Sequence, residues 1–372
     1  MKTNVTVQIY TGSFYAPDAH IDLTSLKAKF TKIYQKAHVE CVMIGWNPNA
    51  DISILKDFLK QHGTDVYLWL PVFSDWHEMA PLIGMDNLPV TQDYQAEKGE
   101  RFEFGCPAHI KSIKNIKEIF EKKFRNDHYD GIFLDKIRFP SFISGLQPVL
   151  TCFCSYCRSL HGISEKIMTH GDENPLAITA YDRLHYHSED KDIAQLFDYK
   201  AKVVTSSIAD LHQYFREQGF KIGLDLFAPF LSWFVGQDYL SLAQYADFIK
   251  PMFYRETYAP AGLPYEIDKY ATAFGDGLKM TEVRKRNLLN LLKTNEIDID
   301  FINREIKDIR NQIGNVKLYA GIEVNYNEKI APVKAPYIQE NLKKMSGADG
   351  FAFSWDLCST PDENLDAALE CL

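Results

Sequence analysis

The chain has 372 residues, ordinary apolar and charged fractions and a formal net charge of −9, so it can bury a large core. It has no basic cluster that could follow a phosphate backbone, and we expect no nucleic-acid partner. No apolar run approaches the roughly 18 residues of a membrane-spanning helix, so we expect no membrane partner. Residues 1–5 lack the apolar segment of a signal peptide, which favours the cytoplasm unless a leader precedes them.

Eight short apolar segments alternate with helical patterns along the chain. Strands are expected at 5–10, 39–45, 66–73, 131–134, 221–227, 248–254, 317–324 and 350–354. The main connecting helices are expected at 22–37, 52–62, 107–128, 196–219, 239–245, 336–345 and 362–372. This alternation is typical of a parallel sheet with helical crossovers. Eight such units predict one closed (β/α)8 (TIM) barrel over residues 1–372.

Two long segments interrupt the repeat. Residues 141–195 form a cysteine-bearing insertion after strand four, and residues 255–315 form a helical insertion after strand six. We expect them to wall a pocket, which favours exo action or short oligosaccharides over an open groove. No Gly-x-Gly-x-x-Gly follows the first strand, so no organic cofactor is expected.

The stretch 130–140, Asp-Gly-Ile-Phe-Leu-Asp-Lys-Ile-Arg-Phe-Pro, places a carboxylate at the end of a buried strand. Burying a charge is costly unless it has partners at a cavity mouth. The carboxyl ends of barrel strands are where active sites form. We therefore expect Asp135 to be an active-site acid.

Other carboxylates stand at the ends of later strands: Asp225 on the fifth, Glu323 on the seventh and Asp356 after the eighth. Strand alternation directs Asp135 and Glu323 into the barrel mouth. Each alone could be a structural carboxylate bonded to a loop, but four together favour a site. Cleavage of a glycosidic bond needs two carboxyl groups. We expect Asp135 to act with either Glu323 or Asp225, with the roles of acid and nucleophile left open.

Aromatic and basic side chains also gather at the strand ends. Sugars present flat apolar faces that stack on aromatic rings, and cations could hold a neighbouring carboxylate ionised. Arg138 has two interpretations, a substrate clamp or an ion-pair partner of Asp135. The expected substrate-binding residues are Trp46, Asp75, Trp76, Arg138, Lys250, Tyr254, Tyr326, Trp355 and Asp356.

Segments 130–140, 225–229 (Asp-Leu-Phe-Ala-Pro) and 251–254 (Pro-Met-Phe-Tyr) resemble glycoside hydrolase families of (β/α)8 type. In those families Asp-Gly-Ile-x-Leu-Asp-x-Ile-Arg-[Tyr/Phe]-Pro marks strand four. The resemblance covers most of the barrel and implies a carbohydrate-active enzyme whose strand-four aspartate, Asp135, is catalytic.

The chain departs from two other barrel types at strand four. Chitinase-like barrels carry Asp-Gly-x-Asp-x-Asp-x-Glu there, whereas this chain has Phe133 and Ile137 in place of two of the acids, so that mechanism does not apply. A larger clan ends strand four in Asn-Glu, where this chain has Leu134 and Asp135. Glu323 matches the nucleophile position of that clan by analogy alone.

The seven cysteines are Cys41, Cys106, Cys152, Cys154, Cys157, Cys358 and Cys371. An odd count does not suit a secreted disulfide framework and favours a reducing compartment. Cys152, Cys154 and Cys157 offer three thiolates to a soft metal, with Cys106, His161, His109 or His170 as the fourth ligand. We expect a structural zinc ion held by the first three and Cys106. Free thiols, an iron–sulfur cluster and a catalytic metal are the alternatives. His185 and His187 are two residues apart and on a helix would face different ways, so we expect them at the surface rather than as metal ligands.

These features predict a glycoside hydrolase acting on an oligosaccharide or glycoside. Two alternatives remain: a barrel that binds carbohydrate without cleaving it, and a metal-dependent hydrolase. The last lacks the His-x-His that usually ends the first strand of such barrels. No sequence feature indicates an oligomeric state.

Overall fold

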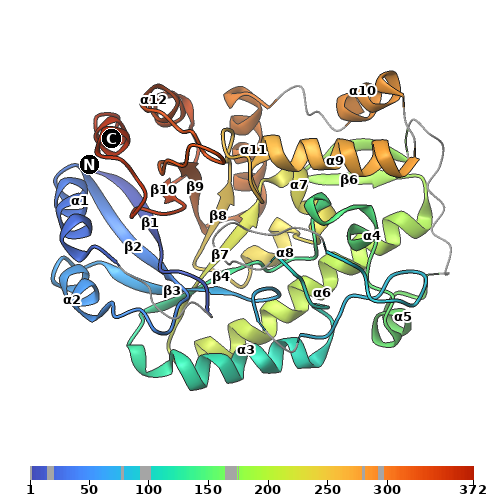
Figure 1. Cartoon of the computed structure of the whole chain (residues 1–372), viewed down its shortest axis with the longest axis horizontal. Helices are drawn as coiled ribbons and strands as arrows, with labels where there is room; N and C mark the ends of the chain where they lie inside the picture. The colour runs from blue at the N-terminus through green and yellow to red at the C-terminus, as the bar shows by residue number, and fades with distance from the viewer. Residues whose placement is uncertain are drawn as a thin grey trace.

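The computed structural model describes residues 2–14, 21–76, 79–92, 102–163, 174, 176–278, 281–291 and 297–372. Eight parallel strands close into a barrel in the order β1-β10-β9-β8-β7-β4-β3-β2 (Figure 1). They are β1 (Thr3–Tyr10), β2 (Ala37–Gly45), β3 (Asp65–Pro71), β4 (Gly131–Asp135), β7 (Lys221–Phe227), β8 (Phe248–Met252), β9 (Lys317–Glu323) and β10 (Gly350–Ser354). The predicted (β/α)8 barrel is confirmed.

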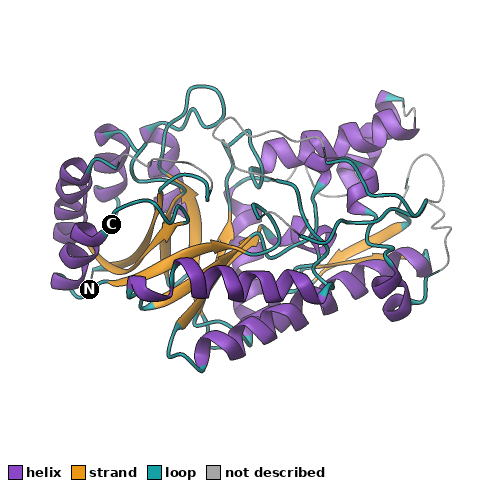
Figure 2. Ribbon diagram, turned by 60° about the horizontal axis from the view of Figure 1, so that its bottom comes forward, coloured by secondary structure: helices purple, strands orange, loops and turns teal. Residues whose placement is uncertain are grey.

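Helices connect consecutive strands and lie outside them (Figure 2). They are α1 (Leu23–Lys36), α2 (Ser53–Gln61), α3 (Ile110–Lys123), α6 (Lys191–Arg216), α8 (Tyr239–Ala243), α11 (Ile299–Ile313), α12 (Ala335–Lys344) and α13 (Asp362–Leu369). In α1 the buried apolar residues are Leu26, Phe30 and Ile33, the spacing that turns one helical face toward the strands. None of the described helices is both long and apolar enough to cross a bilayer.

The barrel interior is filled by large aromatic rings. Phe248 lies 5.7 Å from Phe133 and 5.5 Å from Tyr67, measured between ring centroids. Gly223 provides the space for the Phe248 ring, because a Cβ atom on Gly223 would come within 2.3 Å of it. Gly131 does the same for Tyr67. The barrel is therefore a packed core, and any ligand site must lie at one of its ends.

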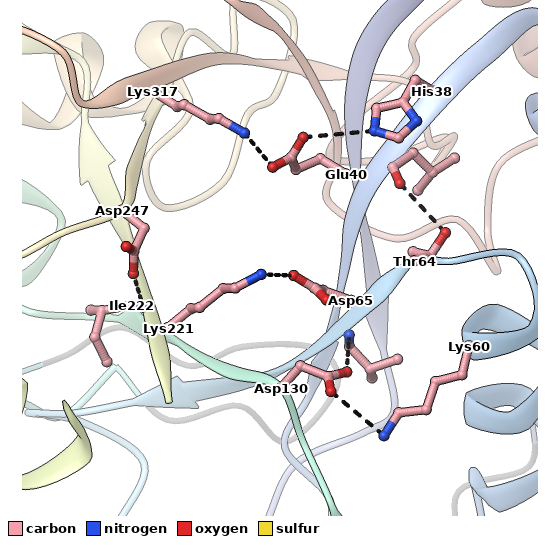
Figure 3. A network of polar contacts seen from close by, with 12 residues as sticks. His38, Glu40, Lys60, Thr64, Asp65, Asp130, Lys221, Ile222, Asp247 and Lys317 are labelled. Atoms are coloured by element: carbon pink, nitrogen blue, oxygen red, sulfur yellow. Dashed lines mark hydrogen bonds and ion pairs between the residues drawn. The ribbon is translucent and has the colours of Figure 1, made fainter. Parts of the chain in front are cut away.

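Ion pairs join the strands at their amino-terminal ends (Figure 3). Lys221 lies 2.5 Å from Asp65, and Lys317 pairs with Glu40. Asp247 accepts a hydrogen bond from the backbone N–H of Ile222 at 2.7 Å. These side chains neutralise one another's charge, which fits a stabilising role at this end of a barrel.

The segment after β4 contains η2 (Phe142–Ser144), α4 (Leu146–Val149), α5 (Ser155–His161) and an antiparallel hairpin of β5 (Ile178–Asp182) and β6 (His185–Ser188). His185 and His187 both belong to β6, where His185 is half-buried and His187 is exposed. The other added elements are α7 (Pro229–Ser232), η3 (Trp233–Val235), α9 (Leu263–Leu278) and α10 (Glu282–Leu291).

These added elements extend from one side of the barrel (Figure 1), and all of them except α5 and α7 contribute to a second apolar cluster. Its buried aromatic residues are Phe142, Phe153, Tyr186, Phe197, Trp233, Phe234 and Tyr270. The cluster fixes the segment after β4 against α6 and α9.

Candidate active site

A cavity opens at the carboxyl ends of the barrel strands. Its polar lining comprises Gln8, Asp135, Lys136, Arg138, Asp225, Thr257 and Asn327, and its aromatic lining comprises Trp46, Trp69, Phe102, Phe227, Tyr254 and Trp355. The cavity therefore unites carboxylates, cations and flat apolar rings at the end of the barrel where such folds perform chemistry.

Asp135 ends β4 and is 8 % exposed. Its Oδ2 accepts a hydrogen bond from the indole N–H of Trp69 at 2.8 Å, and its Oδ1 accepts one from the backbone N–H of Lys136. Lys136 has a φ of 51°, in the left-handed region, which turns the chain sharply at the end of the strand. Both donors stabilise the ionised carboxylate.

Asp225 lies deeper, on β7, next to Lys250 of β8. The Nζ atom of Lys250 lies 2.9 Å from both carboxylate oxygens and also donates to Gln8 Oε1 at 3.0 Å and Tyr254 Oη at 2.6 Å. Burial raises the pKa of Asp225 to about 7, the positive charge of Lys250 opposes the rise, and the negative charge of Asp135 adds to it. Burial also lowers the pKa of Lys250. Asp225 can therefore hold a proton near neutral pH.

Two further cations line the cavity. Lys136 Nζ donates to Asp75 Oδ2 at 2.6 Å in a buried ion pair. Arg138 is 3 % exposed, and its guanidinium lies between two rings, 4.2 Å from the Phe104 centroid and 4.4 Å from that of Phe227.

Glu323 does not reach the cavity. It is 0 % exposed, and its Oε1 accepts the backbone N–H groups of Glu256 and Thr257 at 2.9 and 3.0 Å. Its Oε2 accepts the hydroxyl of Tyr337 at 2.5 Å. Those contacts connect β9 to the loop after β8 and to α12.

Asp356 likewise binds backbone, accepting the N–H groups of Tyr10 at 3.1 Å and Cys358 at 3.0 Å. Trp76 donates to the carbonyl of Pro71 at 2.7 Å and lies outside the lining.

The predicted site residues therefore divide into two groups. Trp46, Asp135, Arg138, Asp225, Tyr254 and Trp355 line one cavity. Asp75, Trp76, Lys250, Glu323, Tyr326 and Asp356 do not line it. Asp75 and Lys250 still contact lining residues through their ion pairs, whereas Tyr326 is a 41 % exposed neighbour of Asn327.

Sequence reasoning missed three lining residues that contact the carboxylates. Gln8 is a polar residue within a buried apolar strand, and that exception was a usable signal. Lys136 directly follows Asp135. Trp69 gave no signal, because a tryptophan inside a buried strand is indistinguishable from core.

The four cysteines expected to bind metal come together. Their Sγ atoms all lie within 4.8 Å of one another, and Cys157 Sγ is 3.4 Å from those of Cys106 and Cys154. Sulfurs around a tetrahedral zinc ion lie about 3.8 Å apart, given Zn–S bonds of about 2.3 Å. The cluster can therefore hold a metal ion of that kind.

Two of the candidate histidine ligands form hydrogen bonds with the backbone, and the third lies outside the described residues. His161 contacts the carbonyl of Cys152 at 3.2 Å and accepts the N–H of Ile163 at 3.0 Å. His109 caps α3 by accepting the N–H of Lys111. His170 lies outside the described residues.

No family model matches the chain, and no curated protein matches it in sequence. Among solved structures, the glycoside hydrolase domain of PgaB (BpsB) from Bordetella bronchiseptica is similar, with a TM-score of 0.52 and 15% identity over 100% of this chain and 97% of that one. A β-galactosidase from the psychrophilic Marinomonas ef1 has a TM-score of 0.50 and 12% identity over 100% of this chain and 58% of that one. At these identities the likeness establishes a barrel fold shared with glycoside hydrolases.

Proposed function

We propose that this protein is a glycoside hydrolase whose carboxylate pair is Asp135 and Asp225. The observation that carries the proposal is that both carboxylates line one cavity yet have different surroundings. Asp135 accepts two N–H groups, whereas Asp225 is buried beside Lys250 with a pKa raised to about 7. Paired carboxyl groups whose environments separate their protonation states are the signature of acid and base roles.

In this mechanism Asp225 gives its proton to the glycosidic oxygen as the bond from that oxygen to the anomeric carbon breaks. The ionised Asp135 either attacks the anomeric carbon or removes a proton from the attacking water. If Asp135 attacks, water then hydrolyses the glycosyl ester, and Asp225 takes up the proton of that water. If Asp135 acts on water instead, it ends protonated and Asp225 ends ionised, and proton exchange with solvent restores both groups. One water is consumed on either route.

The cavity walls suit a sugar. Trp46, Trp355 and Tyr254 present ring surface beside the carboxylates, and a pyranose ring stacks its C–H faces on such rings. The same walls would serve a barrel that binds carbohydrate without cleaving it, so turnover is the property that separates the two functions.

The test is hydrolysis of a panel of nitrophenyl glycosides and oligosaccharides by the wild-type protein and its Asp135→Asn and Asp225→Asn variants. Each substitution should lower kcat by about 10²–10⁴ while the circular dichroism spectrum is unchanged. Asp65→Asn, at the opposite end of the barrel, is the matched control and should keep full turnover. Full turnover by Asp135→Asn would show that the catalytic assignment is wrong, and glycan binding without turnover by the wild type would favour the binding barrel.

We also propose that Cys106, Cys152, Cys154 and Cys157 hold a structural zinc ion in a reducing compartment. Four thiolates complete a tetrahedral shell and leave no position for substrate, which is typical of structural rather than catalytic zinc. None of the four lines the cavity. The backbone N–H of Ile83 donates to Cys152 Sγ at 3.4 Å, so the site ties the loop after β3 to the segment after β4. This location disfavours the metal-dependent hydrolase.

A further inference from the structure

Three cations surround the catalytic carboxylates, and they differ in how their charge is balanced. Lys136 has Asp75 at 2.6 Å, and Lys250 has Asp225 at 2.9 Å. Arg138 has no carboxylate within 4.0 Å among the residues that the structure describes, although it lines the same cavity. The N–H groups of Arg138 that do not bind the Phe139 carbonyl are therefore available to a ligand.

The guanidinium of Arg138 is held in one orientation. The Phe104 and Phe227 rings cover its two faces, and one Nη1 hydrogen bond to the carbonyl of Phe139, 3.1 Å long, fixes one corner. Stacking occupies the faces of a guanidinium and leaves the N–H groups on its edge free to bind. A planar edge with parallel N–H groups matches a carboxylate in bidentate geometry.

A buried guanidinium without an ion-pair partner is costly. Burial lowers the pKa of Arg138 to about 10, against the favourable charges of Glu266, Asp135 and Asp75, so the group is still cationic at neutral pH. A ligand anion would complete the site. Since Asp135 stands beside the ligand, a single negative charge matches one free cation better than a phosphate dianion does.

We propose that Arg138 binds the carboxylate of an acidic sugar, so that the substrate is a glycan containing uronic acid. The inference rests on the proposed hydrolase function, because only a hydrolase would make this bound sugar a substrate. Asp135, the last residue of β4, and Arg138, three positions later, line the same cavity, so the carboxylate belongs to the sugar ring at the point of cleavage. Arg138 is thus a specificity-determining residue.

The test compares binding of matched pairs by isothermal titration calorimetry. The methyl glycosides of glucuronic, galacturonic and mannuronic acid are each compared with their amides, which have the same shape without the charge. At least one uronate should bind the wild-type protein ten or more times more tightly than its amide. In Arg138→Met, which keeps an apolar side chain between the two phenylalanines, that preference should fall below threefold.

Two further variants make the result specific. Arg138→Lys keeps the charge without the planar fork and should retain only part of the preference, and it serves as the readout if Arg138→Met does not fold. Arg216→Met, an exposed arginine paired with Asp247 at the far end of the barrel, should keep the full preference. The proposal would be overturned if the wild type preferred the uronate less than threefold in every pair, or if the preference survived in Arg138→Met. Binding of a sulfated sugar in place of any uronate would also overturn it.

Turnover separates this inference from the function on which it rests. With aryl uronides and the corresponding neutral aryl glycosides, Arg138→Met should lower the uronide-to-neutral ratio of kcat/KM at least 100-fold. If the wild type and Arg138→Met cleave neutral glycosides at equal rates and neither prefers uronides, the inference is overturned and the proposed hydrolase function is retained. If the protein binds uronates through Arg138 but cleaves no glycoside, the uronate-binding site is supported and the proposed hydrolase function is overturned.

Discussion

The Nζ atom of Lys250 lies 2.9 Å from both carboxylate oxygens of Asp225, and both side chains are enclosed in the barrel. Burial favours the neutral carboxyl group, whereas the adjacent ammonium favours the ionised one. A pKa of about 7 for Asp225 is the balance between these effects. The acid of the proposed mechanism is therefore tuned by a lysine that does not line the cavity.

Replacing Lys250 with methionine should raise the pKa of Asp225, because the substitution removes the charge that favours ionisation and leaves burial in place. The alkaline limb of the kcat/KM–pH profile, expected near pH 7 in the wild type, should move upward by about one unit or more. Lys221→Met removes a lysine that pairs with Asp65 at the other end of the barrel and should leave the limb in place. An unshifted limb in Lys250→Met would show that Asp225 does not set it.

Glu323→Gln should reduce stability more than catalysis. Glutamine keeps one carbonyl oxygen for the N–H groups of Glu256 and Thr257 but cannot offer a second acceptor to Tyr337. We expect a loss of about 1–3 kcal/mol in the free energy of unfolding, measured by urea denaturation. The value of kcat should stay within about tenfold of the wild type, whereas a catalytic carboxylate would lose about 10² or more. A loss as large as that of Asp135→Asn would restore Glu323 as a candidate catalytic residue.

The barrel was predictable because buried parallel strands leave a strong signal in sequence. The bounds of β7 and β10 agree with the predicted segments 221–227 and 350–354, since each is a short apolar run between turn residues. The hairpin of β5 and β6 was missed. Its turn residues, Arg183 and Leu184, adopt φ values of 49° and 67°, where glycine or asparagine is the usual signal.

The candidate site was predictable only in part. Strand-end position brought Asp135, Asp225 and Arg138 to one cavity, because parallel strands all end at the same face. The same rule selected Glu323, whose backbone donors come from a loop about 66 positions earlier in the chain. Periodicity shows where a carboxylate points, but it contains no information on which distant backbone N–H groups will satisfy it.

Removing the metal site should lower thermal stability. The wild type should contain about one zinc ion per chain by emission spectroscopy, and less than about half an equivalent would count against the site. Cys106→Ser removes the ligand on the loop after β3, so it should bind zinc at least tenfold more weakly and unfold about 5 °C or more below the wild type. Cys358→Ser, an exposed thiol outside the cluster, should change neither quantity.

Stability should depend on pH through Glu305 on α11. Its carboxylate is buried and accepts the Tyr181 hydroxyl of β5 at 2.9 and 3.0 Å, and burial raises its pKa to about 8. A glutamate in the unfolded chain has a pKa of about 4.3. Between pH 4.3 and pH 8 the folded state therefore holds a proton that the unfolded state has lost. The stabilising contribution of Glu305 to the free energy of unfolding is fully present below pH 4.3 and is lost as the pH rises through 8.

Glu305→Gln removes this titration while keeping an acceptor for Tyr181. Between pH 6 and pH 9 the unfolding free energy of the variant should therefore improve relative to the wild type by on the order of 2 kcal/mol, measured by urea denaturation at each pH. Asp225 titrates in the same direction in both proteins and cancels in the difference. Glu340→Gln, an exposed glutamate paired with Lys344, should give a curve parallel to that of the wild type. If the curve for Glu305→Gln is also parallel, the buried carboxylate does not titrate in this range.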